Sequence, residues 1–200
     1  VDRALEAFQE VVRLDPDNRY ALVNLQKLHE DQHQWADALR VRERIANIDG
    51  EPRPENQQIL GFLRNEIGSA QLRNGDLATA SRTFGDALDA DAGTAPAYLN
   101  LGDVRERQGN LAGAIEAWEL LVHSVPDRAY LAFDRLQHAY RTLGAPRRFV
   151  DLWQSVIAAN PQDWRARLAL SNYFEYSGDH RAALDVLLDA LPHHPHGLAI

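Results

Sequence analysis

Apolar residues recur at spacings of three and four along most of the chain, and short turns containing glycine or proline separate the stretches. The stretch from Ile59 through Leu63 and Ile67 to Ala70 is one example. This spacing places apolar side chains on one face of a helix. Glycine often ends a helix because it adopts the left-handed conformation that closes the last turn. The pattern therefore predicts a chain of amphipathic helices.

The pattern itself repeats. Three stretches align without gaps: "NGDLATASRTF" from Asn74, "QGNLAGAIEAW" from Gln108 and "SGDHRAALDVL" from Ser177. A spacing of 34 residues separates Gly75 from Gly109, Ala80 from Ala114, Phe84 from Trp118, Gly144 from Gly178 and Pro161 from Pro195. A fixed period of this length is the mark of a repeat architecture, in which each unit is one small group of helices.

Each unit is predicted to hold two helices. The second helix begins after Gly-Asp or Gly-Asn, whose short polar side chain can cap free backbone N–H groups. A small residue then allows the paired helices to approach closely, and a bulky residue follows four positions later. The small residues are Ala80, Ala114 and Ala183, and the bulky ones are Phe84, Trp118 and Leu187.

This arrangement resembles the tetratricopeptide repeat (TPR) family, whose pattern W-x2-L-G-x2-Y, A-x3-F, P matches with the right offsets. One unit alone carries Tyr98, Leu101, Gly102, Ala114, Trp118 and Pro126. Another departs from the pattern, because Phe149 stands at the small alanine position. The resemblance implies an all-α, right-handed α-solenoid of about five and a half repeats.

The repeat register predicts one solenoid over residues 1–200. It divides this solenoid into a half repeat at 1–18, a long repeat at 19–60, and units at 61–94, 95–129, 130–163 and 164–197. Ala4 and Phe8 take the A-x3-F positions, so the chain opens on the second helix of a repeat. A half repeat cannot bury its apolar face alone. We therefore expect the chain to be part of a longer protein.

The second unit is longer than the others. Ala38 and Ala80 are 42 residues apart, and the extra residues fall in "DGEPRPENQQ", residues 49–58. Pro54 suits the first turn of a helix. We predict two added turns on the helix that follows, with a longer loop as the alternative.

Residues 29–33, "HEDQH", match the H-E-x-x-H motif of zinc peptidases. A zinc site needs both histidines on one helix, a third ligand and an open coordination position. In the repeat register His29 faces the paired helix, whereas His33 lies at the turn. Ala36 and Leu39 occupy the glycine and third-histidine positions of the longer motif. We interpret the match as chance and predict no metal site here.

Other candidate chemistry is sparse. "HHPH", His193 to His196, offers loose metal ligands, but Pro195 belongs to the repeat and favours a loop. The chain has no cysteine, which excludes a disulfide framework and cysteine-ligated zinc. Its net charge of −8 disfavours nucleic acid as a partner. We therefore expect a non-catalytic protein without cofactor or metal, whose partner is a protein or peptide.

In the TPR family the first helix of each pair lines a concave groove. The family's groove positions fall on Asn65, Asn100, Asp103, Arg107, Arg135, His138, Arg141 and Asn172. We hypothesise a polar groove with a basic pocket in residues 130–145 that grips an acidic segment or a C-terminal carboxylate. A solvated surface of mixed charge is the alternative.

The order of regular, lengthened and irregular units also resembles the lipopolysaccharide assembly protein B family. That resemblance implies a bacterial adaptor that regulates lipopolysaccharide biosynthesis through proteolysis. It also implies a cytoplasmic location, with a membrane anchor supplied by a segment outside this chain and no insertion by the chain itself. Two alternatives stay open. In one, the repeats belong to an enzyme whose catalytic domain lies elsewhere. In the other, they form homo-oligomers through exposed repeat ends.

Overall fold

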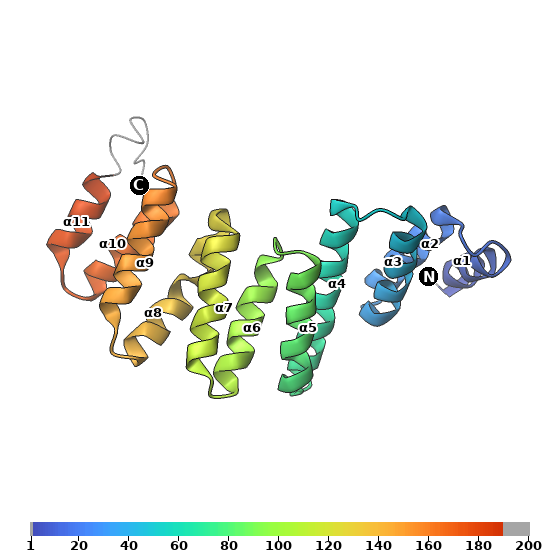
Figure 1. Ribbon diagram of the computed structural model, residues 1–200, viewed down its shortest axis with the longest axis horizontal. Coiled ribbons are helices and arrows are strands. Elements are labelled where there is room, and N and C mark those ends of the chain that lie inside the picture. Colours follow the sequence, from blue (N-terminus) through green and yellow to red (C-terminus); the bar gives the residue numbers. More distant parts are fainter. Residues whose placement is uncertain (1, 190–200) are drawn as a thin grey trace. The chain divides into compact units, whose positions relative to one another are not determined.

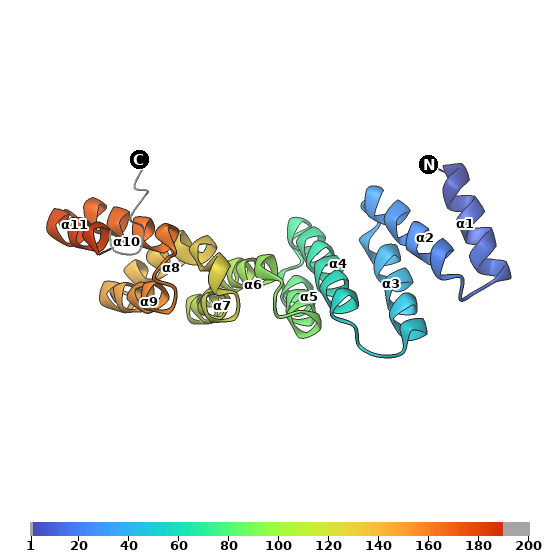
Figure 2. The same ribbon diagram turned by 90° about the horizontal axis from the view of Figure 1, so that it is seen from above.

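Helix follows helix throughout the computed structural model, which describes residues 2–189 (Figure 1). All the regular structure of these residues is helical. Seen from above, successive helices lie in pairs (Figure 2). The predicted all-α fold of repeated helix pairs, an α-solenoid, is therefore confirmed. The chain divides into two units, residues 1–110 and residues 111–200.

Unit 1, residues 1–110, consists of consecutive helices that each contact the next. They are α1 (Asp2–Leu14), α2 (Arg19–Asp31), α3 (Trp35–Asp49), α4 (Pro54–Arg73), α5 (Leu77–Ala90) and α6 (Ala95–Arg107). The helix α4 has 20 residues, whereas α2 and α6 have 13 each. Pro54 stands in its first turn. The predicted lengthening of this helix is confirmed.

Unit 2 begins at residue 111 and is described as far as residue 189. It holds α7 (Leu111–Ser124), a 3-10 helix η1 (Pro126–Ala132), α8 (Phe133–Thr142), α9 (Pro146–Ala159), α10 (Trp164–Tyr176) and α11 (His180–Leu188). The sequence predicted two helices for the unit at 130–163, which departs from the repeat pattern at Phe149. For the first of these helices, the structure has a 3-10 turn followed by the ten-residue α8.

The helix ends follow the sequence closely. The backbone angle φ is +82° at Gly75 and +65° at Gly144, which is the left-handed conformation expected for a glycine that closes a helix. Asp76 accepts a hydrogen bond from the backbone N–H of Thr79 at 3.0 Å. Asp179 caps α11 in the same way. The predicted caps of these second helices are thus confirmed.

The cores form where paired helices approach. In unit 1, Ala80 and Phe84 of α5 are completely buried. A methyl group added at Gly68 of α4 would lie 2.7 Å from the Phe84 ring. Such a distance is shorter than van der Waals contact, so only glycine lets the ring pack at this place. The predicted roles of Ala80 and Phe84 are confirmed.

Aromatic rings fill the core of unit 2. Trp118 and Trp153 are completely buried, and Phe149 is 1% exposed. Phe149 stacks on Trp153 with ring centroids 5.7 Å apart, and Phe133 meets both rings edge-on. Trp153 donates its indole N–H to the carbonyl of Ala166 at 3.1 Å. The bulky Phe149 at the alanine position thus holds the first turn of α8 through Phe133.

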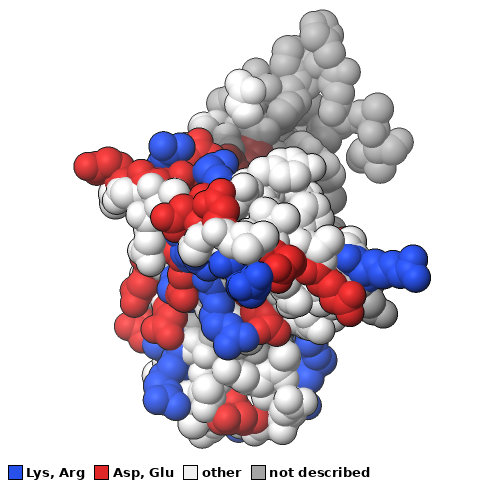
Figure 3. Space-filling view, turned by 90° about the vertical axis from the view of Figure 1, so that its right-hand side faces the viewer, with Lys and Arg blue, Asp and Glu red and all other residues white. Residues whose placement is uncertain are grey.

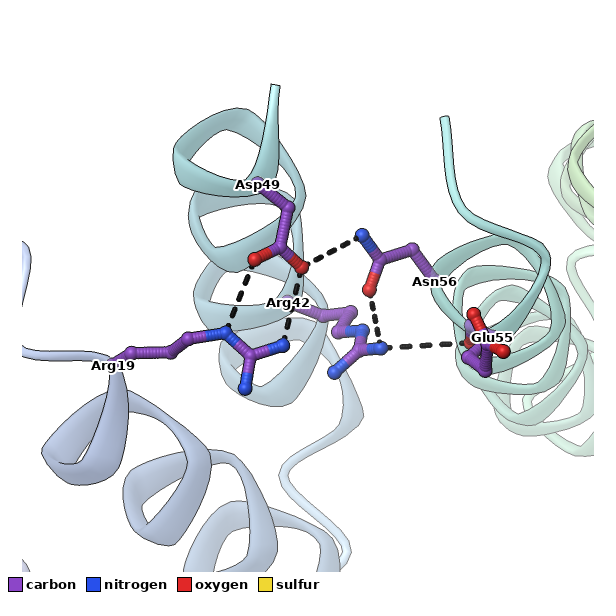
Figure 4. A network of polar contacts seen from close by, with 5 residues as sticks. All are labelled: Arg19, Arg42, Asp49, Glu55 and Asn56. Carbon is purple, nitrogen blue, oxygen red and sulfur yellow. Dashed lines mark hydrogen bonds and ion pairs between the residues drawn. The ribbon is translucent and has the colours of Figure 1, made fainter. Parts of the chain in front are cut away.

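A polar network joins the start of α2, the end of α3 and the start of α4 in unit 1 (Figure 4). Arg19 of α2 donates to both carboxylate oxygens of Asp49 in α3, at 3.1 and 3.2 Å. Asn56, in the first turns of α4, donates to Asp49 at 3.1 Å and accepts from Arg42 at 2.6 Å. The added turns of α4 are therefore held to α3 by side chains that the insertion itself supplies.

No helix among residues 2–189 combines the length and the apolar character needed to cross a bilayer.

Candidate functional site

The two histidines of the H-E-x-x-H match are separated by the end of a helix. α2 ends at Asp31, and His33 lies in the turn with φ +56°. His29 is 9% exposed, and its Nδ1 lies 2.7 Å from Oε1 of Gln34. His33 is exposed and contacts the Trp35 ring at 5.2 Å. The predicted position of His33 at the turn is confirmed. Residues 193–196 lie outside the described part.

In unit 1, the predicted groove residues partly satisfy one another. Asn100 of α6 donates to Oδ1 of Asn65 in α4 at 2.9 Å. Asn65 is 5% exposed and donates in turn to Glu66 at 3.2 Å. Asp103 is half-buried on α6, and Arg107 is exposed at the end of that helix. The structure thus brings Asn65 and Asn100 together as a bonded pair.

In unit 2, the predicted basic residues lie along α8. His138 and Arg141 are exposed, and Nη2 of Arg141 lies 3.5 Å from Nδ1 of His138. Arg135 is half-buried on the same helix. Asn172 is exposed on α10. Of these four residues, Asn172 alone borders the hollow described next.

A hollow of about 360 Å³ lies between α8 and α10, each of which is the first helix of its pair. It is called the α8–α10 hollow here. Its lining is mainly aromatic and apolar and consists of Tyr130, Phe133, Asp134, Gln137, Trp164, Arg165, Leu168, Ala169, Asn172, Tyr173 and Tyr176. Trp164 is 54% exposed and Tyr176 is 89% exposed. Large apolar side chains that gather on one exposed surface are typical of sites that bind another molecule.

Two charged side chains complete the hollow. The Arg165 guanidinium lies over the Tyr130 ring, 5.1 Å from its centroid, and 5.9 Å from that of Trp164. These rings hold the guanidinium by cation–π attraction. Asp134 is exposed on α8. One acid and one base thus border a hollow whose lining is mainly aromatic and apolar.

On one face of the protein, acidic and basic side chains are mixed. On the face drawn in Figure 3, acidic and basic side chains alternate over short distances. That face therefore has no broad region of a single charge, so electrostatic contacts there are short-ranged.

The sequence analysis missed the aromatic residues of the hollow. Tyr130, Trp164 and Tyr176 stand outside the repeat pattern, because none takes a position that packs paired helices. The signal that was available is their polar surroundings. Trp164 follows Pro-Gln-Asp and Tyr176 precedes Ser-Gly-Asp, and both stretches are turns in the repeat register. An aromatic residue at a turn lies outside the core face and is free to contact a partner.

Helix pairs of this spacing define a helical repeat protein. Residues 65–129 match the family model described as tetratricopeptide repeat. Residues 65–129 therefore carry tetratricopeptide repeats, and the resemblance to this family noted in the sequence is confirmed.

Two curated relatives illustrate the range of proteins that share these repeats. Lipopolysaccharide assembly protein B of Escherichia coli strain K12 is 22% identical over 195 residues, which is 97% of this chain and 49% of that protein. A probable UDP-N-acetylglucosamine–peptide N-acetylglucosaminyltransferase SPINDLY of Hordeum vulgare is 25% identical over 117 residues, 58% of this chain and 12% of that protein. The chain thus spans half the length of the first relative and a small part of the second.

The same fold is present in solved structures. BtubC (BKLC) from P. vanneervenii superposes with a TM-score of 0.50 at 15% sequence identity, over 94% of this chain and 86% of that chain. At this identity the likeness concerns the fold alone.

Proposed function

We propose that the chain is a non-catalytic scaffold that binds a segment of a partner protein in the α8–α10 hollow. The TPR fold supports a role in protein interaction, because stacked helix pairs present extended surfaces for peptides and protein segments. The observation that carries the proposal is the group of exposed aromatic and apolar side chains around the hollow.

The energetics favour an apolar anchor on the partner. Leu168 is 41% exposed, and Trp164 and Tyr176 are more exposed still. Covering such surface contributes about 25 cal/mol per Å² of apolar area. Aromatic residues in a central pocket are also the commonest hot spots of protein interfaces. The partner segment therefore inserts an apolar side chain between α8 and α10.

The polar residues on the same helices set the orientation of the segment. We propose that Asn172 bonds its backbone, and that Arg135, His138 and Arg141 of α8 attract acidic residues beside the apolar anchor. We propose that Asn100, Asp103 and Arg107 of unit 1 form a corresponding polar surface there, and that the buried Asn65 orients Asn100 through their hydrogen bond. Each is a predicted groove position of the first helices, and substitution of each tests its contribution.

A finer proposal concerns the pathway. We propose that the chain is an adaptor that regulates lipopolysaccharide biosynthesis through proteolysis, and that it works in a bacterial cytoplasm. The alignment with lipopolysaccharide assembly protein B, which extends over almost the whole of this chain, supports this proposal. Its partners are then an enzyme of lipopolysaccharide synthesis and a membrane-bound protease.

The experiment compares three full-length baits in a Gram-negative lysate, with captured proteins identified by mass spectrometry. One bait is the natural chain, and one carries Leu168→Asp with Tyr176→Ala. The control carries Leu143→Asp, because Leu143 is also half exposed but lies outside the hollow. Captured partners are then purified and their affinities measured.

We expect a lipopolysaccharide-synthesis enzyme or membrane protease to bind the natural and control chains at least tenfold more tightly than the double variant. Equal binding to all three chains would refute the α8–α10 hollow as the site. Another partner, lost only in the double variant, would keep the scaffold and refute the pathway.

The match to a glycosyltransferase supports one alternative, in which the repeats serve an enzyme through a catalytic domain elsewhere. The captured partner distinguishes this case, because a glycosyltransferase substrate would then replace the lipopolysaccharide enzyme. Self-association is the other alternative. Sedimentation velocity at several concentrations tests it directly, since an oligomer dissociates on dilution.

A further inference from the structure

A second hollow lies in unit 1, and it is independent of the site proposed above. It measures about 340 Å³ and lies between α2 and α4, with Arg42 of α3 also in its lining. Val23, Ile59 and Phe62 provide apolar walls, and Phe62 is 45% exposed. Gln26, Glu30 and Arg42 provide polar groups. It is called the α2–α4 hollow here.

Gln26 leaves one buried hydrogen-bond acceptor unused. Its side chain is 6% exposed, and its Nε2 donates to Oε1 of Glu30 at 2.7 Å. A carboxylate can only accept, so this bond fixes which end of the amide faces Glu30. The other end, Oε1 of Gln26, is buried and has no hydrogen-bond partner.

Arg42 leaves one buried donor unused. Its residue is 6% exposed, and its Nη2 donates to Oδ1 of Asn56 at 2.6 Å and to the backbone carbonyl of Glu55 at 3.5 Å. Figure 4 shows the guanidinium reaching from α3 to the start of α4. Both acceptors are neutral groups. The Nε–H of Arg42 is buried and has no partner.

Two unpaired buried groups in one lining are unusual, because native proteins pair nearly all such groups. One is a donor and the other is an acceptor, and an apolar wall stands beside them. Each buried group without a partner costs free energy that a suitable ligand restores. The pair therefore indicates what kind of ligand the hollow takes.

We propose that the α2–α4 hollow binds a carboxamide, the side chain of an asparagine or glutamine on a partner protein. The carboxamide oxygen accepts from Nε–H of Arg42, and its NH2 group donates to Oε1 of Gln26. Its methylene groups pack on Val23 and Phe62. Both unpaired atoms are closed to solvent in this structure, so the exposed side chains of Lys27 and Gln58 at the rim move aside to admit the ligand.

Other side-chain classes fit this pair less well. A carboxylate cannot donate to Gln26, and the neighbouring Glu30 repels it. An ammonium group cannot accept from Arg42, and the guanidinium repels it. A neutral thioether or hydrocarbon leaves both groups unpaired. A hydroxyl both donates and accepts through one oxygen, whereas a carboxamide presents its donor and acceptor on separate atoms.

The test uses the full chain labelled with nitrogen-15 and four small probes that share a three-carbon chain: propanamide, propanoate, propylammonium and 1-propanol. The signals followed by NMR are the Arg42 Nε–H and the Gln26 NH2 group. We expect propanamide to shift both signals in a saturable way, with an affinity at least tenfold higher than that of each other probe. Water alone in the hollow would give no saturable shift and would overturn the proposal.

Two variants make the test specific. Gln26→Leu removes the acceptor but leaves the hydrogen bond from Arg42 to Asn56. The affinity for propanamide, followed through the Arg42 signal, should fall at least fivefold. Gln57→Leu is the control, because Gln57 is a half-buried residue of α4 outside this hollow. Unchanged binding in Gln26→Leu, or equal binding of 1-propanol, would overturn the carboxamide assignment. Neither result depends on the α8–α10 hollow, which lies in the other unit.

Discussion

Arg42 and Asn56 form a buried hydrogen bond of 2.6 Å between α3 and α4, and both residues are at least 94% buried. Asn56 belongs to the inserted segment that lengthens α4, and it also bonds Asp49 at 3.1 Å. The inserted segment therefore provides a hydrogen-bond acceptor for the buried guanidinium of Arg42, which would otherwise have fewer hydrogen bonds.

Asn56→Ala should destabilise the protein by about 2 kcal/mol, because it leaves a buried guanidinium with one bond fewer. Urea denaturation followed by circular dichroism measures the change. Gln57→Ala is the control, since Gln57 neighbours Asn56 but makes no side-chain hydrogen bond, and it should change the stability by less than about 0.5 kcal/mol. Equal losses in the two variants would contradict the role of the bond.

The acid stability should depend on Asp49. Hydrogen bonds from Arg19 and Asn56 lower the pKa of this carboxyl to about 2, against an ordinary value of 3.8. A lowered pKa contributes stability above pH 3.8, and this contribution is lost as the pH falls towards 2. Unfolding by urea at intervals from pH 5 to pH 2.5 should therefore show a smaller pH dependence in Asp49→Asn than in the natural chain. An identical pH dependence of stability in the two proteins would refute this role of Asp49.

Two glycines in one pair of helices should respond in opposite directions. Gly68→Ala places a methyl group 2.7 Å from the buried Phe84 ring, so we expect a loss of about 1–3 kcal/mol. Gly85→Ala meets nothing within 4 Å, and it should stabilise α5 by up to about 1 kcal/mol. Thermal unfolding of both variants gives the signs, and a stabilising Gly68→Ala would disprove the close approach of the helices.

His33 takes the backbone conformation that glycine takes in the other turns between paired helices, with φ +56°. A side chain in this conformation costs about 1 kcal/mol. His33→Gly should therefore raise the free energy of unfolding by a few tenths to about 1 kcal/mol. The gain is limited because the substitution also removes the contact with Trp35. Gln32→Gly is the control, because Gln32 has an ordinary φ of −92°, and that change should destabilise.

The repeated helix pairs could be predicted from sequence because local rules and packing agree there. Gly75 and Asp76 mark one turn, and Ala80 and Phe84 mark the packed face four residues apart. The 3-10 segment before α8 could not be predicted. It depends on Phe133 meeting Phe149 and Trp153, which is a contact between residues that lie far apart in the sequence.

The candidate sites were less predictable than the fold. The first helices were expected to line a polar groove, and the bond between Asn65 and Asn100 joins two of the residues named for it. The hollows themselves depend on which side chains stay exposed after packing. Trp164 of α10 and Trp153 of α9 are both tryptophans on helices, yet one is 54% exposed and the other is completely buried. Only the three-dimensional arrangement separates them.

The lengthened helix α4 also affects how unit 1 unfolds. α3 and α4 make the main contact between the first three helices and the following three. In a linear stack, cooperativity passes only through such neighbouring contacts. The polar network of Arg19, Asp49 and Asn56 reinforces this contact at one end. Weakening it would let α1 to α3 open as a separate foldon, and hydrogen exchange would show two classes of amide protection in place of one.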